Sequence, residues 1–245
     1  MKTFARQNWF PRSILLAALV ATAGVVSQAK DLALNYLKDG QVDVVMLLAP
    51  PPQPDSPEQA ADMDEVKIVY HSAGSNDMAA AHGEKKFSVF NFTEAVGPFF
   101  QATNLLKTTA FFEKIQNDAA VTTDQGKLFF RRPRPYTSDP SLANGKLEKS
   151  FSYPSGHSTE SMVLALVLAE LLPGNRAAIL DHARTMGWHR VQIARHYPTD
   201  IYAGRVLAQA IVRDFKENPI FKKDFEDVKG EIQASLVLAQ AVGHK

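Results

Sequence analysis

The spacing of apolar residues is helical over most of the chain. Met63, Val66 and Val69 recur at helical intervals after Ser56, which is followed by the proline and glutamate of a helix start. This pattern predicts a helix over about 57–72. Further apolar stripes predict helices around 92–100, 111–119, 202–211 and 225–239. The stretches 74–86 and 136–153 lack periodicity and are expected to be loops.

One segment, residues 158–172, is apolar on nearly every side and ends at Pro173-Gly174. A helix that is apolar all round must be buried in its fold. Strand-like alternation is scarce in the chain. We therefore expect an all-α fold, a single-domain helical bundle around this central buried helix.

The first 55 residues divide into two segments. Lys2, Arg6 and Arg12 precede an apolar run at 14–26, and Ser27-Gln28-Ala29 supplies small residues for cleavage, which predicts a signal peptide at 1–29. The run of about 13 residues would span only roughly 20 Å as a helix, short of a bilayer core. Residues 30–55 contain a triproline and predict an extended N-terminal arm before a domain at 56–245. We expect a periplasmic or secreted protein with no stable membrane insertion after cleavage.

Composition narrows the classes of function. The 27 Lys and Arg nearly balance the 26 Asp and Glu, so no broad basic surface indicates nucleic acid as a partner. The absence of Cys excludes disulfides, thiolate nucleophiles and zinc fingers. Any site for an anion must therefore be a local cluster.

The first such cluster is basic. Four cations fall within eight positions, from Lys127 through Arg131 and Arg132 to Arg134, and two prolines keep the backbone out of helix. Such a cluster suits a phosphate group. Its alternative interpretation is a solvated basic turn.

The second cluster, Tyr153-Pro154-Ser155-Gly156-His157-Ser158, stands directly before the central helix. Gly156 permits close backbone contact with a ligand, and the free amides at a helix start attract an anion. His157 could donate a proton there, or it could only pack near the helix start.

The third cluster is Arg190, five residues, His196, three residues and Asp200. Asp200 could hold one imidazole nitrogen of His196 and leave the other free to attack. A single His-x-x-x-Asp pair is by itself often only a surface contact.

Two other chemistries fit less well. His182, His189 and His196 recur every seven residues, but on one helix neighbours would lie about 10.5 Å apart, too far to share a zinc ion, so we expect no metal site. A serine hydrolase would use Ser155, yet the Gly-x-Ser-x-Gly elbow is absent and the cations would be unexplained.

Together the three clusters resemble the signature of the type 2 phosphatidic acid phosphatase superfamily, in order and in spacing. The segment 151–158 is similar to the Gly-Ser-Tyr-Pro-Ser-Gly-His-Thr signature of the class A bacterial non-specific acid phosphatases. The triproline and the segment 55–66 also resemble that class. The departures are Phe151 and Ser158, in place of Gly and Thr, and His189, in place of the Ser before Arg190. His189 could alter substrate choice or pH dependence.

The resemblance implies an exported acid phosphatase that hydrolyses phosphomonoesters without metal or cofactor, through a phosphohistidine. His196 would be the nucleophile, Asp200 would orient it, and His157 would protonate the leaving alcohol. The residues implied to bind phosphate are Lys127, Arg134, Ser155, Gly156 and Arg190. Since His157 would start protonated and His196 neutral, we expect bell-shaped activity favouring acid to neutral pH.

Two alternative functions remain. The same superfamily contains vanadate-dependent haloperoxidases, in which vanadate occupies the phosphate site. A non-catalytic, exported phosphate-binding protein would also use the cations. In each case the expected partners are small molecules, and a helical surface could also pair with a second copy of the chain as a homo-oligomer.

Overall fold

The computed structural model describes residues 33–84 and 86–243, and the predicted signal peptide lies outside these residues. Over the described ranges the chain forms α-helices, short 3₁₀ turns and loops, with no β-strand. The predicted all-α class is thus confirmed.

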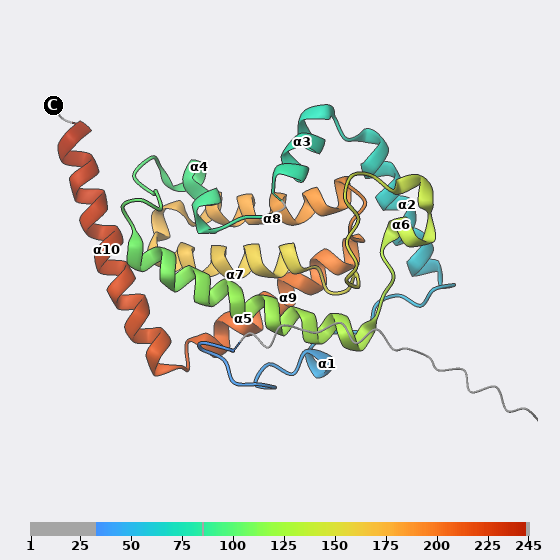
Figure 1. Ribbon diagram of the computed structural model, residues 1–245, viewed down its shortest axis with the longest axis horizontal. Coiled ribbons are helices and arrows are strands. Elements are labelled where there is room, and N and C mark those ends of the chain that lie inside the picture. The colour runs from blue at the N-terminus through green and yellow to red at the C-terminus, as the bar shows by residue number, and fades with distance from the viewer. Residues whose placement is uncertain (1–32, 85, 244–245) are drawn as a thin grey trace, which may run out of the picture. The chain divides into compact units, whose positions relative to one another are not determined.

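Helix α7 (Gly156–Leu171) occupies the centre of the bundle, as Figure 1 shows. It packs against α5 (Leu106–Phe130), α8 (Arg176–Gln192) and α9 (Pro198–Phe215). Side chains on every side of α7 are buried, Val163, Leu164 and Leu168 among them. The helix begins two residues before the predicted start because the Ser155 hydroxyl caps it by accepting from the amide of Ser158.

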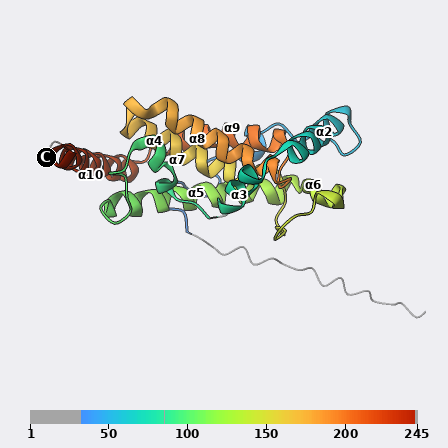
Figure 2. The ribbon, with the colours of Figure 1, turned by 90° about the horizontal axis from the view of Figure 1, so that it is seen from above.

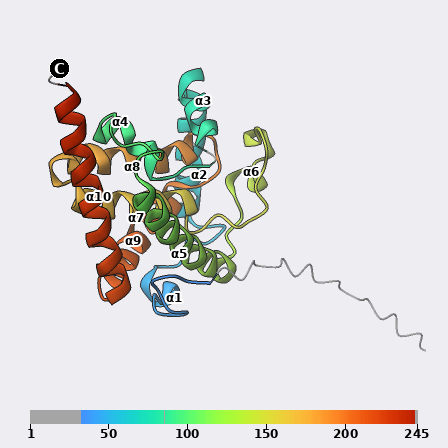
Figure 3. The same cartoon turned by 60° about the vertical axis from the view of Figure 1, so that its left-hand side comes forward.

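The remaining elements surround this centre. Helix α10 (Pro219–Gly243) crosses the end of α5 at which Glu231 accepts from the amides of Lys107 and Thr108 (Figures 1 and 3). The other helices are α1 (Val44–Leu47), α2 (Pro57–Ser72), α3 (Ser75–Gly83), α4 (Thr93–Val96) and α6 (Pro135–Ser138). The 3₁₀ turns are Val89–Phe92, Pro140–Leu142 and Pro173–Asn175.

Three local expectations need correction. The predicted loop at 74–86 contains α3, which begins where the Asp77 carboxylate accepts from the amide of Gly74. The helix expected over 92–100 ends at Val96, because Gly97 adopts a φ of 125° that a helix cannot continue through. Helix α8 has no counterpart among the predicted helices.

The described part of the predicted arm, residues 33–55, packs on the bundle. Asp118 of α5 accepts hydrogen bonds from the amides of Asn35, Tyr36 and Leu37. Tyr36 is buried in the main core, and α1 adds a helical turn, so the segment is not extended throughout. The domain boundaries themselves stay a prediction.

Four helix ends meet at the end of the bundle opposite α10. The last turns of α5 and α8 and the first turns of α7 and α9 converge there, and α2 and α6 lie beside them (Figures 1 and 2). Within the described ranges, none of the helices has the length and apolar character needed to cross a membrane. The three sequence clusters stand at these converging ends.

Candidate active site

His196 and Asp200 are joined by a tight turn between two helices. Helix α8 ends at Gln192, and Ala194 takes a left-handed φ of 50° before α9 begins at Pro198. His196 Nδ1 lies 3.3 Å from Asp200 Oδ2, and both side chains are almost fully buried. Because a carboxylate only accepts, Nδ1 carries the proton and Nε2 keeps its lone pair.

The Asp200 carboxylate is held by three further donors. Its Oδ2 accepts from the Ser152 hydroxyl at 2.5 Å and from the amide of Tyr197 at 2.9 Å. Its Oδ1 accepts from Arg132 Nη1 at 2.6 Å. These contacts fix the rotamer that directs Oδ2 at the imidazole.

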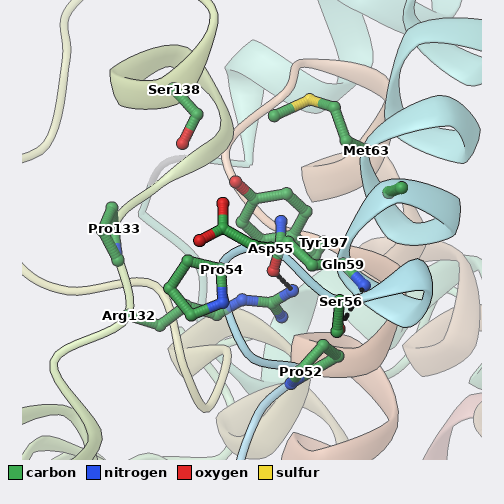
Figure 4. Close-up of a pocket in the computed structure, with 11 residues that line it drawn as sticks. Pro52, Pro54, Asp55, Ser56, Gln59, Met63, Arg132, Pro133, Ser138 and Tyr197 are labelled. Carbon is green, nitrogen blue, oxygen red and sulfur yellow. Dashed lines mark hydrogen bonds between the residues drawn. The ribbon is translucent and has the colours of Figure 1, made fainter.

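Arg132 connects this carboxylate to helix α2. Its Nη2 donates to Asp62 Oδ2 at 2.7 Å and to Gln59 Oε1 at 2.6 Å, and its guanidinium stacks 3.9 Å from the ring centre of Tyr197. Figure 4 shows Arg132, Gln59 and Tyr197 lining a pocket of about 330 Å³, closed on another side by prolines of the arm. The predicted helix at 57–72 therefore supports the turn that carries His196 and Asp200.

The cations of the basic cluster do not all point the same way. Lys127 and Arg134 are buried, whereas Arg131 takes a left-handed φ of 50° at the end of α5 and its side chain is exposed. Lys127 Nζ donates to the carbonyl of Phe151 at 2.9 Å. Burial and the charge of Arg134 lower the pKa of Lys127 to about 8.

Arg134 brings positive charge to the free nitrogen of His196. Its Nη1 lies 3.2 Å from His196 Nε2 and donates to the carbonyl of Arg195 at 2.9 Å, while its Nε donates to the carbonyl of Ser150 at 2.8 Å. Burial and then the charges of Arg134 and Lys127 hold the pKa of His196 well below its ordinary value. The imidazole is therefore neutral and able to attack.

Arg190 lies in the last turn of α8 and points towards the region that Arg134 and His196 line. Its Nη1 donates to the carbonyl of Ala81 at 3.2 Å. Its Nε is buried and has no hydrogen-bond partner among the described residues, which leaves a donor for a ligand.

One carboxylate bridges the two arginines. Glu148 Oε2 lies 2.5 Å from Arg134 Nη2, and Glu148 Oε1 lies 2.8 Å from Arg190 Nη2. Burial alone would raise the pKa of Glu148, but the surrounding cations, Arg134 foremost, lower it to about 2. One anion of this size can thus engage both guanidinium groups at once.

Ser155, Gly156 and His157 begin the central helix beside these cations. The amide of Ser155 donates to the carbonyl of Asp200 at 3.1 Å, which ties the start of α7 to α9. His157 Nε2 lies 3.1 Å from the carbonyl oxygen of Glu84, so Nε2 carries a proton. Burial and the charge of Arg190 lower the pKa of His157 to about 3, so the free protein holds it neutral, unlike the protonated starting state expected from the sequence.

His189, the departure from the superfamily motif, pairs with the same Glu84. Its Nδ1 lies 2.9 Å from Glu84 Oε2, and the Glu84 backbone carbonyl holds His157. His182 instead packs against the ring of Phe92, at 5.1 Å between centroids. In the described residues no group of three His, Cys, Asp or Glu side chains is placed to hold a metal.

All the residues predicted for the site lie at this end of the bundle. Sequence reasoning missed Glu148, Ser152 and Asp62 and did not separate Arg132 from its neighbours, because their roles depend on contacts between distant segments. The one available signal for Arg132 was its position two residues before Arg134, within the same basic cluster.

The sequence is similar to known proteins over most of its length. Residues 104–215 match the PAP2 superfamily. The chain is 27% identical to an acid phosphatase of Zymomonas mobilis, over 78% of this chain and 76% of that protein. It is 29% identical to a non-specific acid phosphatase of Providencia stuartii, over 81% and 84% of the two chains. A non-specific acid phosphatase of Salmonella typhi is also 29% identical, over 76% of this chain and 78% of its own.

Proposed function

The chain contains a domain of the PAP2 superfamily, and from this premise we propose that it is an exported acid phosphatase that hydrolyses phosphomonoesters through a phosphohistidine. One observation carries the proposal. His196 presents an unprotonated Nε2 within 3.2 Å of Arg134, while Asp200 holds its other nitrogen. This arrangement supports a nucleophilic role for His196, because Arg134 could hold the phosphoryl group next to Nε2.

In the first step the Nε2 lone pair of His196 attacks phosphorus and the bond to the ester oxygen breaks. The imidazole becomes cationic, and the buried Asp200 carboxylate stabilises that charge through Nδ1–H. In the second step His157, neutral after the first step, takes a proton from water as the water oxygen attacks phosphorus; the bond between phosphorus and Nε2 breaks, which releases orthophosphate and restores neutral His196.

Several donors would hold the phosphoryl oxygens. Lys127, Arg134 and the free Nε of Arg190 supply positive charge from a buried environment, where it acts strongly on the developing charge of the transition state. The Ser155 hydroxyl and the Gly156 amide add donors at the start of α7. These cations take the role that Mg²⁺ has in other phosphoryl-transfer enzymes, so the proposed reaction needs no metal.

His157 would supply the proton to the leaving alcohol. The pKa of His157 is about 3 in the free protein, so its imidazole is neutral before substrate binds. The proton for the leaving alcohol must therefore be taken up on substrate binding or be carried by the substrate. A bound phosphoryl group places negative charge near the ring and raises its pKa, and a phosphomonoester monoanion carries a proton of its own. Both effects favour activity on the acid side of neutrality.

The test is hydrolysis of p-nitrophenyl phosphate from pH 4 to pH 9, with and without EDTA. We expect chelator-resistant activity on the acid side, and no phosphoenzyme after rapid quenching in His196→Ala. His182→Ala is the matched control, since it removes an imidazole that packs against Phe92. Phosphoenzyme in His196→Ala, or loss of wild-type activity in EDTA, would contradict the mechanism.

A further inference from the structure

Glu148 occupies the donors that a phosphoryl group would need. Its two carboxylate oxygens take one Nη2 donor each from Arg134 and Arg190, at 2.5 and 2.8 Å. Phosphoryl oxygens that bridge the same two guanidinium groups would compete for those nitrogens, because Nε and Nη1 of Arg134 already donate to the carbonyls of Ser150 and Arg195. The carboxylate and the phosphoryl group therefore compete for the two Nη2 donors, while Nε of Arg190 stays open to a phosphoryl oxygen.

The backbone around Glu148 is anchored independently of its side chain. The Tyr136 hydroxyl donates to the carbonyl of Glu148 at 2.8 Å and accepts from its amide at 3.2 Å. Two residues further on, the Ser150 carbonyl and hydroxyl accept from Arg134. The loop can thus stay in place while the side chain moves.

The Glu148 side chain is also free to move away from the two arginines towards solvent. It is 29% exposed, whereas the side chains of Arg134 and Arg190 are each 3% exposed. Rotation about its own bonds would carry the carboxylate into solvent and leave both guanidinium groups facing the ligand.

We propose that Glu148 is a built-in competitor for the phosphate site, a residue that sets affinity by alternating with the phosphoryl group on Arg134 and Arg190. The inference rests on the proposed function, because it takes both arginines as phosphate ligands. The apparent dissociation constant for a phosphate ester, and for the product orthophosphate, is the intrinsic constant divided by the fraction of molecules in which Glu148 has left, so binding is weakened. Return of the carboxylate after hydrolysis would help to expel orthophosphate.

The competing interpretation is that Glu148 only aligns the arginines. The two roles have opposite consequences for binding. A competitor weakens phosphate binding, so its removal tightens binding. An aligning residue strengthens phosphate binding, so its removal loosens it.

The test is calorimetric titration of orthophosphate into wild type, Glu148→Gln and Glu148→Ala, together with KM and kcat for p-nitrophenyl phosphate. We expect orthophosphate to bind roughly tenfold more tightly in both variants, and KM to fall by a similar factor. Asp64→Asn is the matched control, because it removes the same charge from an exposed position of α2 and should leave both constants unchanged.

Unchanged or weaker orthophosphate binding in the two variants, with their helical circular dichroism intact, would overturn the inference. An equal tightening of orthophosphate binding in Asp64→Asn would also overturn it, since the change in affinity would then come from the lower negative charge of the protein and not from the position of Glu148. Wild-type protein that neither binds orthophosphate nor hydrolyses the ester would instead refute the proposed function, and the inference with it.

Discussion

Arg132 is one of the three donors that orient the Asp200 carboxylate, and it is the only charged one among them. Its guanidinium lies between two buried carboxylates, 2.6 Å from Asp200 and 2.7 Å from Asp62, and its side chain is 4% exposed. Buried charges are costly to leave without a partner, so removing one member of such a group is more harmful than replacing the group. Arg132 is therefore both a structural and a positioning residue.

We expect Arg132→Gln to lower the free energy of unfolding by about 3 kcal/mol or more, because two buried carboxylates lose their cation. The turnover rate should fall by roughly ten- to a hundredfold, since Asp200 loses the cation on Oδ1, one of the donors that fix it beside His196. Denaturant unfolding and kcat measure the two effects.

The double variant Arg132→Gln/Asp62→Asn separates these roles. It removes one unpaired carboxylate and should recover part of the stability but not kcat. Recovery of kcat along with stability would mean that Arg132 acts only through folding.

Among the elements, the start of α7, where we propose that phosphate binds, is positioned by its close approach to α9. A Cβ atom on Gly204 of α9 would lie 2.9 Å from the carbonyl oxygen of Ser155 and 3.0 Å from Ser158 Cβ. No side chain can be added there without moving one helix. The same contact ties Ser155, Gly156 and His157 to the helix that carries Asp200.

Gly204→Ala should therefore shift the start of α7, with a loss of about 1–3 kcal/mol in stability and a lower kcat. Gly230→Ala on α10 is the matched control. A Cβ on Gly230 meets no atom within 4 Å, so alanine should stabilise the helix by up to about 1 kcal/mol and leave kcat alone. A normal kcat in Gly204→Ala would show that the helix start tolerates the shift.

At the scale of the whole molecule, burial of the site makes folding depend on pH. Burial and nearby arginines lower the pKa values of His82, His157 and His196. Below the ordinary imidazole pKa of about 6.5 the unfolded chain takes up protons at these residues while the folded chain does not, so acid favours unfolding. Glu160 acts in the opposite sense, because burial raises its pKa to about 7.

Comparison of the wild type with His157→Gln separates the contribution of His157 to the pH dependence of stability from the contributions of the other groups. Between pH 7 and pH 5 the wild type should lose about 2 kcal/mol more stability than the variant, because the pKa of His157 rises from about 3 to its ordinary value on unfolding. Urea unfolding of both proteins at the two pH values measures the difference. Equal losses would show that His157 titrates normally in the folded protein.

The helical class, the central helix and the three clusters could be predicted from the amino-acid sequence, because each is a local property. The all-round apolar character of 158–172 required burial, and the spacing of Arg190, His196 and Asp200 follows from one turn between two helices. Helix α3 was not predicted because Ala81 is its one buried residue, so no apolar stripe marks it in the sequence.

The pairing of the charged side chains in the site depends on the tertiary structure and could not be predicted from the sequence. Nothing in the local pattern around Glu148 distinguishes it from a solvated loop residue, yet it bridges Arg134 and Arg190 from a different segment. Likewise, Arg131 and Arg132 are adjacent in sequence, but the left-handed turn at Arg131 leaves one exposed and buries the other beside Asp200. Pairing and burial of charge depend on which distant segments meet, and no pattern within one segment contains that information.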